Sequence, residues 1–347
     1  MTKRKKKIGI LTAGGDCPGL NAAIRGVGKT AIVEYGMEVI GVRSGYSGLI
    51  NNDYIELKES QLSGILTLGG TILGTSREKP FKLLGPNGEA NDKPDAILHN
   101  YEKLGLDALV CIGGNGTMKT AHMLSKQGMN IVGIPKTIDN DVWGTDVTFA
   151  FESAVEIATE AIDRLHTTAN SHQRVMIIEV MGHNAGWLAL YAGTAGGGDI
   201  ILLPELPYNI RSVCKKVESR YEDNKPYSIV VVAEGIERPE KRSAASHIAE
   251  AIGTYTGLET RETVLGYIQR GGSPSPFDRI LATEYGAFAA ECIAGENFGT
   301  MTAYINNKTV AVPLSEVGGK TRLVKPDDPL VLIARRMGIS FGDEYLK

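Results

Sequence analysis

Three stretches of the sequence and one scattered group carry glycine, hydroxyl, carboxylate or basic residues in ways that suit the handling of phosphate. The first is Thr12–Asn21 (TAGGDCPGLN) and the second is Gly113–Thr117 (GGNGT), and each follows a short apolar run. Glycine lets backbone N–H groups approach a phosphate, and the helix expected after each loop offers its positive N-terminal end. The first stretch is not a Walker A motif, which needs Gly-Lys-Ser/Thr. A tight turn explains either loop alone equally well, but two such loops on neighbouring strands predict a diphosphate cradle.

The third stretch, Pro135–Asp141 (PKTIDND), is too polar to continue the apolar run Ile131–Ile134 that precedes it. One interpretation is an Asx-rich turn with helix capping. We favour a general base and a carboxylate beside a metal, with Lys136 as a point charge for phosphate. This interpretation fits because ligands of parallel α/β sheets bind beyond the carboxyl ends of the strands.

The fourth group is a scattered set of basic and acidic residues near other strand ends. Glu234 follows the apolar run Ile229–Val232, and Arg261 and Arg270 flank a predicted strand over Val264–Ile268. A surface salt bridge explains any single arginine. Several arginines beside glycine-rich segments favour an anion site, because guanidinium groups match phosphate geometry. The arginines in question are Arg77, Arg174, Arg261 and Arg270.

An alternation of strand-like and helix-like segments must position these stretches. Helical segments are expected over about 19–35, about 95–104, after Gly116 and over Phe151–His166. The apolar runs predict strands over Lys7–Thr12, Met37–Val42, Ala108–Ile112, Ile131–Ile134, Val175–Val180, Ile200–Leu203, Ile229–Val232 and Val264–Ile268. Unbroken apolar strands separated by helices predict parallel sheets covered on both faces. A domain boundary is expected just past Asp141–Gly144.

Composition limits the class of protein. The 347 residues suffice for two domains or one large α/β unit, and 42% are hydrophobic. The net charge of −3 gives no reason to expect nucleic acid or a membrane as partner. Four scattered cysteines without a CxxC pair argue against a zinc site and a disulfide scaffold. No apolar stretch approaches the roughly 20 residues that span a bilayer. We therefore expect a cytoplasmic protein.

Taken in order, these motifs resemble the 6-phosphofructokinase family across nearly the whole chain. The matching stretches are Gly14–Asn21, Gly113–Thr117, Pro135–Asp141, Ser171–Arg174, Glu179–Gly182 and Glu259–Pro274. The resemblance implies two Rossmann-like three-layer α/β/α domains with mostly parallel sheets and the active site between them. The larger domain, 1–150 plus about 268–320, would bind the phosphoryl donor. The smaller domain, 151–267 plus about 321–347, would bind the sugar phosphate.

The resemblance also implies an activity. The γ-phosphoryl group of ATP would pass to the 1-hydroxyl of fructose 6-phosphate, with Mg²⁺ as the metal, giving fructose 1,6-bisphosphate and ADP. Asp139 would accept the hydroxyl proton, Thr137 would orient the hydroxyl, and Asp141 would lie near the metal and the transferring phosphate. Lys136 and Gly116 would complete the catalytic set. The chain would form a homodimer or homotetramer in which Arg174 reaches across an interface.

The resemblance assigns the remaining positions to two binding sites and one metal site. The sugar phosphate would contact Arg174, Met181, Gly182, His183, Glu234, Arg261, Tyr267 and Arg270. The donor would contact Gly14, Gly15, Tyr46, Arg77, Lys82, Asn115, Gly116 and Thr117. The metal would be held by Asn115 and Asp141.

Three positions depart from the family pattern. Asn115 stands where most relatives have a metal-proximal Asp, and an amide oxygen binds Mg²⁺ directly or through water but adds no charge. His183 replaces an Arg of many relatives, and an imidazole is only partly charged at pH 7. Tyr267 replaces a His of some ATP-dependent relatives, and a phenol can donate the same hydrogen bond.

Donor choice and catalytic competence leave alternatives open. In this family an Asp in place of Gly116 accompanies pyrophosphate use, so Gly116 favours ATP, while Lys136 is shared by pyrophosphate enzymes and some ATP enzymes. One alternative is a pyrophosphate-dependent enzyme, and another is a kinase of a different sugar phosphate such as sedoheptulose 7-phosphate. A third is a non-catalytic nucleotide or sugar-phosphate sensor, suggested by the departures at Asn115 and His183.

Overall fold

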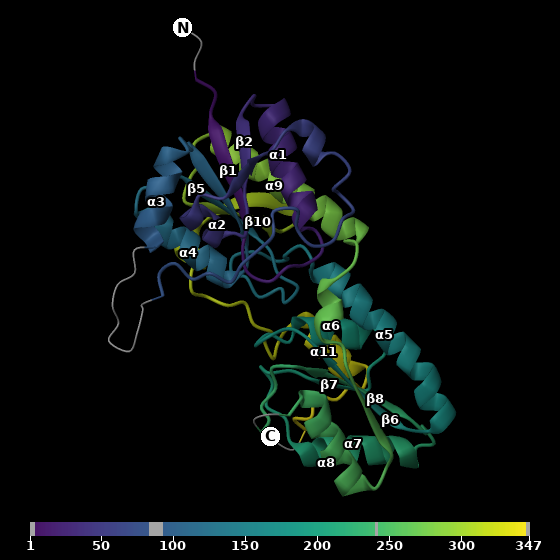
Figure 1. The fold of residues 1–347 in the computed structure, drawn as a ribbon. Coiled ribbons are helices and arrows are strands. Elements are labelled where there is room, and N and C mark those ends of the chain that lie inside the picture. Colours follow the sequence, from purple (N-terminus) through teal and green to yellow (C-terminus); the bar gives the residue numbers. More distant parts are fainter. Residues whose placement is uncertain (1–3, 83–92, 240–241, 345–347) are drawn as a thin grey trace. The chain divides into compact units, whose positions relative to one another are not determined.

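The chain divides into two compact units, shown in Figure 1. The computed structural model describes residues 4–82, 93–239 and 242–344. Unit 1 comprises Met1–Thr137, Asp141–Glu152 and Arg270–Thr321. Unit 2 comprises Ile138–Asn140, Ser153–Gln269 and Arg322–Lys347. The segment Ile138–Asn140 therefore belongs to unit 2, although its chain neighbours on both sides belong to unit 1.

Within the described residues, unit 1 is built on a seven-stranded sheet with the order β11-β10-β5-β4-β1-β2-β3. The strands β10, β5, β4, β1 and β2 run parallel, and the edge strands β3 and β11 pair antiparallel. All residues of β4 and β5 are buried, as expected of strands covered on both faces. The strands are β1 (Lys7–Thr12), β2 (Glu38–Val42), β3 (Tyr54–Glu56), β4 (Ala108–Gly113), β5 (Ile131–Pro135), β10 (Thr300–Ile305) and β11 (Lys308–Pro313).

Helices cover both faces of this sheet. On one face α1 (Leu20–Val33) packs against α9 (Pro276–Ala294). Their backbones approach closely at Gly26, which has no Cβ. A Cβ added there would lie only 2.7 Å from the carbonyl oxygen of Thr283. The other face carries α2 (Tyr46–Asn51), α3 (Lys93–Lys103) and α4 (Asn115–Lys126), whose apolar residues form a core with the strands. The short elements are η1 (Glu59–Leu62) and α10 (Leu314–Val317).

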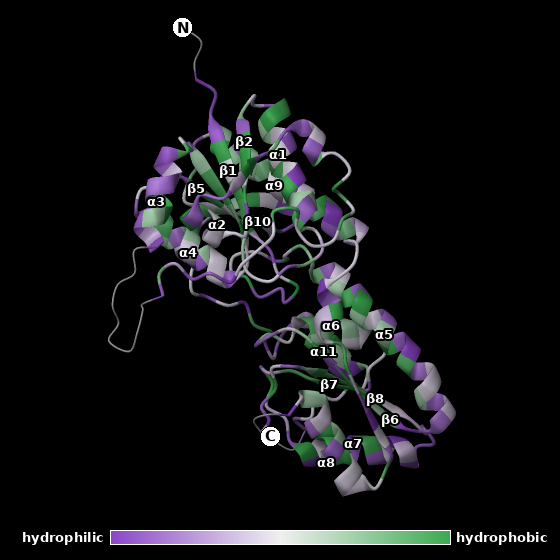
Figure 2. Cartoon of the chain, in the orientation of Figure 1, coloured by the Kyte–Doolittle hydropathy of each residue, from purple (hydrophilic) through white to green (hydrophobic). Residues whose placement is uncertain are grey.

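Unit 2 is built, within the described residues, on a four-stranded parallel sheet with the order β7-β8-β6-β9. Helices α6 and α11 pack together on one face, and α7 and α8 pack together on the other. Figure 2 shows hydrophobic residues along strands such as β7 and β8, and mixed character along the amphipathic helix α5. The elements are α5 (Phe151–His172), β6 (Val175–Val180), α6 (Trp187–Ala195), β7 (Ile200–Leu202), α7 (Ile210–Glu222), β8 (Ser228–Ala233), α8 (Ala244–Thr256), β9 (Thr260–Val264), η2 (Gly266–Arg270) and α11 (Pro329–Arg336).

The predicted class, α/β with mostly parallel sheets, is confirmed, but one predicted strand is wrong. Val264–Ile268 does not form a strand, because β9 ends at Val264 and the 3-10 helix η2 begins at Gly266. Gly266 has φ 53°, a left-handed conformation that turns the chain out of the sheet. Arg261 therefore lies inside β9 and does not flank a strand, whereas Arg270 ends η2.

Several boundaries also differ from the predicted ones. Helix α5 continues to His172, so the SHQ stretch before β6 is mostly helical. Helix α4 begins at Asn115, two residues before the predicted start after Gly116, which places Asn115, Gly116 and Thr117 in its first turn. The edge strands β3 and β11, and the strand β10 beside β11, were not predicted, because their short or partly exposed sequences lack an unbroken apolar run.

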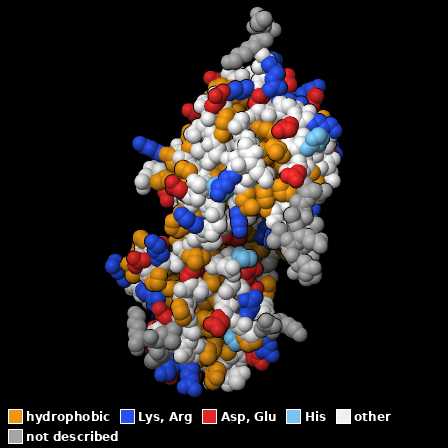
Figure 3. All heavy atoms as spheres, turned by 90° about the vertical axis from the view of Figure 1, so that its left-hand side faces the viewer, with side chains coloured by type: hydrophobic (Ala, Val, Ile, Leu, Met, Phe, Trp, Pro, Cys, Tyr) orange, Lys and Arg blue, Asp and Glu red, His pale blue; other side chains and the backbone are white. Residues whose placement is uncertain are grey.

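The surface carries both signs of charge. On the face drawn in Figure 3, Lys and Arg side chains are interspersed with Asp and Glu side chains, in keeping with a net charge of −3. Among the described residues, no helix combines the length and the apolar character needed to cross a membrane. The four cysteines all lie in described segments, and each is free and buried.

Candidate functional site

The loops of unit 1 that are predicted to bind phosphate meet at one edge of its sheet. Strands β1, β4 and β5 are adjacent and parallel, so the loops after their carboxyl ends are neighbours. The Oγ1 of Thr117 donates a hydrogen bond to the carbonyl of Ala13 at 3.4 Å, which joins the second loop to the first. The hydroxyl of buried Tyr46 donates to the carbonyl of Thr117 at 3.1 Å, and burial raises the pKa of Tyr46. Folding thus assembles the predicted pair of glycine-rich loops.

Lys136 and Arg270 both converge on Gly15 of the first loop. The Nζ of Lys136, a residue only 4% exposed, donates a hydrogen bond to the carbonyl of Gly15 at 2.5 Å. The guanidinium of Arg270 lies where a side chain on Gly15 would stand, with Nη1 1.8 Å from an ideal Cβ. The structure therefore brings an arginine predicted to bind the sugar phosphate against a glycine predicted to bind the donor. Cys17 of the same loop is no nucleophile, since burial raises its pKa to about 12.

At the start of α4, Gly116 has open space beside it, whereas its neighbour Asn115 is held by hydrogen bonds. Gly116 is exposed, and a Cβ there would meet nothing within 4 Å beyond its chain neighbours and the backbone of its own helix. The side-chain amide of Asn115 donates to the Oδ2 of Asp141 at 2.8 Å and to the carbonyl of Asp141 at 3.1 Å. The two residues predicted to hold a metal are thus adjacent, but the contact between them is a hydrogen bond from amide to carboxylate.

Arg77 belongs to a segment that lies along the first loop. The backbone N–H of Gly14 donates to the carbonyl of Ser76 at 2.9 Å, and the Oγ1 of Thr75 donates to the carbonyl of Gly14 at 2.7 Å. These bonds bring exposed Arg77 next to the predicted donor loop. Lys82 is exposed at the end of this described segment.

In unit 2, the predicted sugar residues gather at the carboxyl ends of β6 and β8. These strands are adjacent and parallel, and the backbone N–H of Glu234 donates to the carbonyl of Val180. The carboxylate of Glu234 accepts a hydrogen bond from the backbone N–H of His183 at 2.8 Å. Met181 and Gly182, which directly follow β6, are buried, whereas His183 is exposed. Four of the predicted sugar residues therefore form one cluster.

The segment that carries Asp139 is held by residues that the sequence did not single out. Asp139 is half-buried, and Asn140, which follows it, is 3% exposed with φ 51°. Arg322 donates from Nη1 to the carbonyl of Asn140 at 3.1 Å. The guanidinium of Arg322 lies 3.9 Å from the ring centroid of Trp187, and the indole Nε1 donates to the carbonyl of Arg322 at 3.0 Å. No local motif marks Arg322, because its partners lie far away in the sequence.

Arg174 and Arg261 lie at the opposite end of β6 from the cluster around Met181. Arg174 directly precedes β6, and Arg261 is paired with Met176, the second residue of that strand. Glu259 joins them, with its Oε2 2.9 Å from the Nε of Arg174 and its Oε1 2.5 Å from the Nη2 of Arg261. The hydrogen bond from Arg174 lowers the pKa of Glu259. Glu259, which the sequence did not assign a role, therefore holds two predicted phosphate ligands together.

The length of β6 separates Arg174 and Arg261 from the predicted sugar residues at the carboxyl end of that strand. The seven residue steps from Arg174 to Met181 correspond to about 23 Å at the rise of a β-strand. An arginine side chain cannot cover this distance along its own strand. Of the other predicted sugar residues, Tyr267 is 74% exposed in η2, and buried Gln269 of the same element accepts a hydrogen bond from the N–H of Met181.

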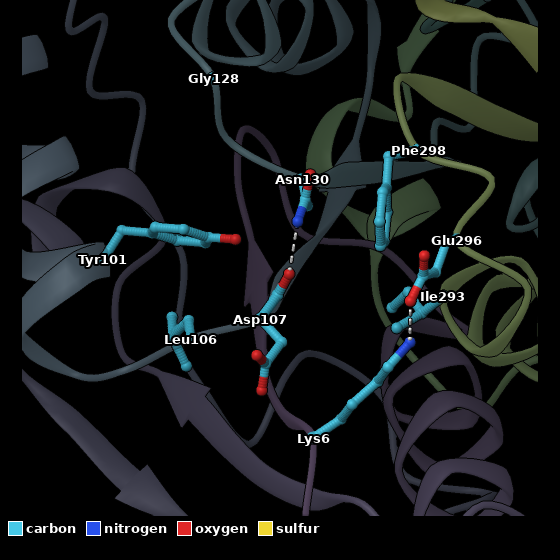
Figure 4. Close-up of a pocket in the computed structure, with 9 residues that line it drawn as sticks. All are labelled: Lys6, Tyr101, Leu106, Asp107, Gly128, Asn130, Ile293, Glu296 and Phe298. Atoms are coloured by element: carbon cyan, nitrogen blue, oxygen red, sulfur yellow. Dashed lines mark hydrogen bonds and ion pairs between the residues drawn. The ribbon is translucent and has the colours of Figure 1, made fainter. Parts of the chain in front are cut away.

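A pocket of about 300 Å³ lies at the other edge of the sheet of unit 1 and contains none of the predicted site residues (Figure 4). It is lined by loops before the strands, since Asp107 precedes β4 and Asn130 precedes β5. Its walls are tied by an ion pair between Lys6 and Glu296 and by a hydrogen bond from Asn130 to the carbonyl of Asp107. These contacts connect the ends of strands and indicate a structural role for the pocket walls.

The fold is that of an α/β protein with two units built on mostly parallel sheets. The chain belongs to the phosphofructokinase family, because the family model for phosphofructokinase matches residues 7–293. It is 60% identical to ATP-dependent 6-phosphofructokinase 3 of Bacteroides thetaiotaomicron, over 97% of this chain and 100% of that protein. It is 55% identical to ATP-dependent 6-phosphofructokinase of Spirochaeta thermophila, over 97% of this chain and 98% of that protein.

A solved structure agrees with the sequence comparisons. Phosphofructokinase from Saccharomyces cerevisiae superimposes with a TM-score of 0.82 at 32% sequence identity. The match covers 90% of this chain but 45% of the yeast chain, so this chain spans less than half the length of the yeast one.

Proposed function

We propose that this chain is an ATP-dependent 6-phosphofructokinase that transfers the γ-phosphoryl group of ATP to the 1-hydroxyl of fructose 6-phosphate. The observation that carries the proposal is the meeting, at one edge of unit 1, of the Gly14–Gly15 loop, Thr117 and Lys136. Backbone N–H groups, a hydroxyl and a buried ammonium are the groups that cradle phosphates. The two relatives described above carry the same activity in their names, which supports the reading.

ATP is the proposed donor because of the open space at Gly116. Even an added Cβ would meet nothing within 4 Å beyond its chain neighbours and the backbone of its own helix, so this position leaves room for the larger part of a nucleotide. Buried Lys136 supplies one positive charge beside the first loop and would neutralise donor phosphate. Arg77, which lies along the same loop, would add a second cation.

Asp139 is the proposed base. Phosphoryl transfer depends on positioning and charge neutralisation more than on covalent chemistry, so the base needs a defined orientation. The hydrogen bond from Arg322 to the carbonyl of Asn140 restrains the peptide directly after Asp139. Thr137 lies two residues before Asp139, and its carbonyl accepts a 2.7 Å hydrogen bond from the hydroxyl of Thr148. Thr137 would orient the sugar hydroxyl.

Mg²⁺ is the proposed metal, and its fit to the residues is partial. Mg²⁺ binds through one or two carboxylates together with substrate phosphates. Asp141 supplies one such carboxylate, and among the described residues no group of three His, Cys, Asp or Glu side chains could hold an ion alone. The ion would neutralise charge on the donor phosphates. Asn115 fits less well as a ligand, because its N–H groups face Asp141.

The proposed sugar site draws on two copies of the chain. Glu234, Met181, Gly182 and His183 would line the site in one chain. Arg174 and Arg261 are joined through Glu259 at the other end of β6, which supports their insertion together into the site of a neighbouring chain. Arg174 was expected to reach across an interface between chains, and the shared partner Glu259 extends this expectation to Arg261. The arrangement predicts a homo-oligomer.

A donor assay tests the proposal most directly. The purified protein is assayed with fructose 6-phosphate and either ATP or pyrophosphate, with sedoheptulose 7-phosphate as a second acceptor. Turnover is expected with ATP and fructose 6-phosphate. Activity with pyrophosphate but not with ATP would show that pyrophosphate is the donor. Binding of both substrates without turnover would favour a non-catalytic sensor.

A further inference from the structure

The contact between Asn115 and Asp141 has a defined direction. Both side-chain hydrogen bonds run from the amide nitrogen of Asn115 to oxygen atoms of Asp141, at 2.8 Å to Oδ2 and 3.1 Å to the carbonyl. The reverse amide orientation would place an oxygen against two oxygens, one of them charged. Electrostatic repulsion therefore excludes it. The Oδ1 of Asn115 is consequently directed elsewhere, and it is buried without a hydrogen-bond partner among the described residues.

The contact joins two elements at the edge where the phosphate-handling loops meet. Asn115 is the first residue of α4, and Asp141 is the last residue of the Pro135–Asp141 stretch, which begins at the end of β5. A hydrogen bond to an ionised acceptor contributes more than one between neutral groups. It would hold the carboxylate of Asp141 in one orientation before any substrate binds.

A carboxylate at position 115 would reverse this interaction. Two ionised oxygens at the present 2.8 Å separation repel each other unless a cation lies between them. An amide at position 115 therefore holds the carboxylate of Asp141 in one orientation without a metal. A carboxylate at position 115 would do so only when a metal ion is bound between the two groups.

We propose that Asn115 is a positioning residue that orients Asp141 by donating hydrogen bonds, and that it is not a metal ligand. The proposal rests on the proposed function, since it assigns Asp141 to the site of phosphoryl transfer. It implies that the protein alone binds a divalent cation weakly, and that the cation is held chiefly by Asp141 and the donor phosphates.

Metal binding without turnover tests the proposal. Binding of Mn²⁺ to the full chain is measured by electron paramagnetic resonance, first without nucleotide. Asn115→Asp is expected to bind Mn²⁺ at least about tenfold more tightly than the native protein, because a second carboxylate then faces Asp141. Equal binding by both proteins would overturn the proposal, and thermal unfolding shows that each variant is folded.

A second measurement separates orientation from ligation. With Mn²⁺ and a non-hydrolysable ATP analogue, Asn115→Ala is expected to keep Mn²⁺ affinity within about twofold, whereas Asp141→Asn loses at least about tenfold. An equal loss in both variants would identify Asn115 as a ligand and overturn the proposal.

Steady-state kinetics add a readout of positioning. Asn115→Ala is expected to lower kcat while leaving the KM for fructose 6-phosphate unchanged, and Asn115→Gln or Asn115→Ser, each of which keeps a donor, should recover part of kcat. Unchanged kcat in Asn115→Ala would contradict a positioning role. The Mn²⁺ measurements stand even if the enzyme uses another donor or acceptor, so failure of the proposed function is distinguishable from failure of this inference.

Discussion

The two units arrange their candidate residues in different ways. In unit 1 the loops after β1, β4 and β5 meet at one edge of the sheet, where Thr117 and Lys136 contact the first loop. In unit 2 the single strand β6 has Arg174 before its first residue and Met181 after its last. Folding of one chain therefore assembles the proposed donor loops, whereas the proposed sugar site would take arginines from a second copy.

The largest effect is expected for Asp139→Ala, in the short segment Ile138–Asn140 that belongs to unit 2. Removal of a general base lowers kcat by about 10²–10⁴-fold. The KM for fructose 6-phosphate should stay within about twofold, because Glu234 and the arginines that are proposed to bind the sugar phosphate remain. Steady-state kinetics measure both constants. A kcat close to that of the native protein would exclude Asp139 as the base.

An intermediate effect is expected at the amino end of β6. Arg174→Ala and Arg261→Ala should each raise the KM for fructose 6-phosphate about 10- to 100-fold, because each removes a charged hydrogen-bond donor to phosphate. The KM for ATP should change little, since the proposed donor loops lie in unit 1. Initial rates with each substrate varied in turn provide the measurement.

Complementation sharpens this comparison between the units. Neither Arg261→Ala nor Glu234→Gln should be fully active alone, but a mixture that is dissociated and reassembled should regain activity. Recovery is expected because some sites would then combine an intact Glu234 from one chain with an intact Arg261 from another. No recovery in mixed oligomers would mean that both residues act within the same chain, and the contrast between the units would fail.

The smallest effect is expected for Gly15→Ala. This variant tests whether the residues of unit 1 contribute only to donor binding or also to binding of the sugar phosphate. The new Cβ would displace the guanidinium of Arg270, which lies 1.8 Å from that position. The displaced group is the end of a flexible side chain, so stability should change little. The KM for fructose 6-phosphate should rise about tenfold, as for one lost charged hydrogen bond.

The double variant Gly15→Ala/Arg270→Ala provides the control. If Gly15 acts through Arg270, the double variant should be no worse than Arg270→Ala alone, because the two changes remove the same contact. A rise in the KM for ATP instead, with additive effects, would show that Gly15 serves the donor.

Much of the fold could be predicted because its signals are local. Strands such as β4 and β6 are unbroken apolar runs, and their boundaries agree with the prediction within one residue. The strand predicted over Val264–Ile268 is wrong because apolar character alone does not reveal the left-handed turn at Gly266. The exposed Tyr267 and Ile268 face away from a core that the sequence suggested they would join.

The sequence by itself determined which chemical groups are available and which strand end each one follows. Glycine-rich loops after β1 and β4, and Lys136 after β5, are readable because strand periodicity and loop composition are properties of neighbouring residues. Only the tertiary structure decided which of these groups touch. It directed the amide of Asn115 to Asp141, placed Arg270 over Gly15 and paired Arg174 with Arg261. These contacts depend on strand register and on packing between segments far apart in the chain, which no local pattern encodes.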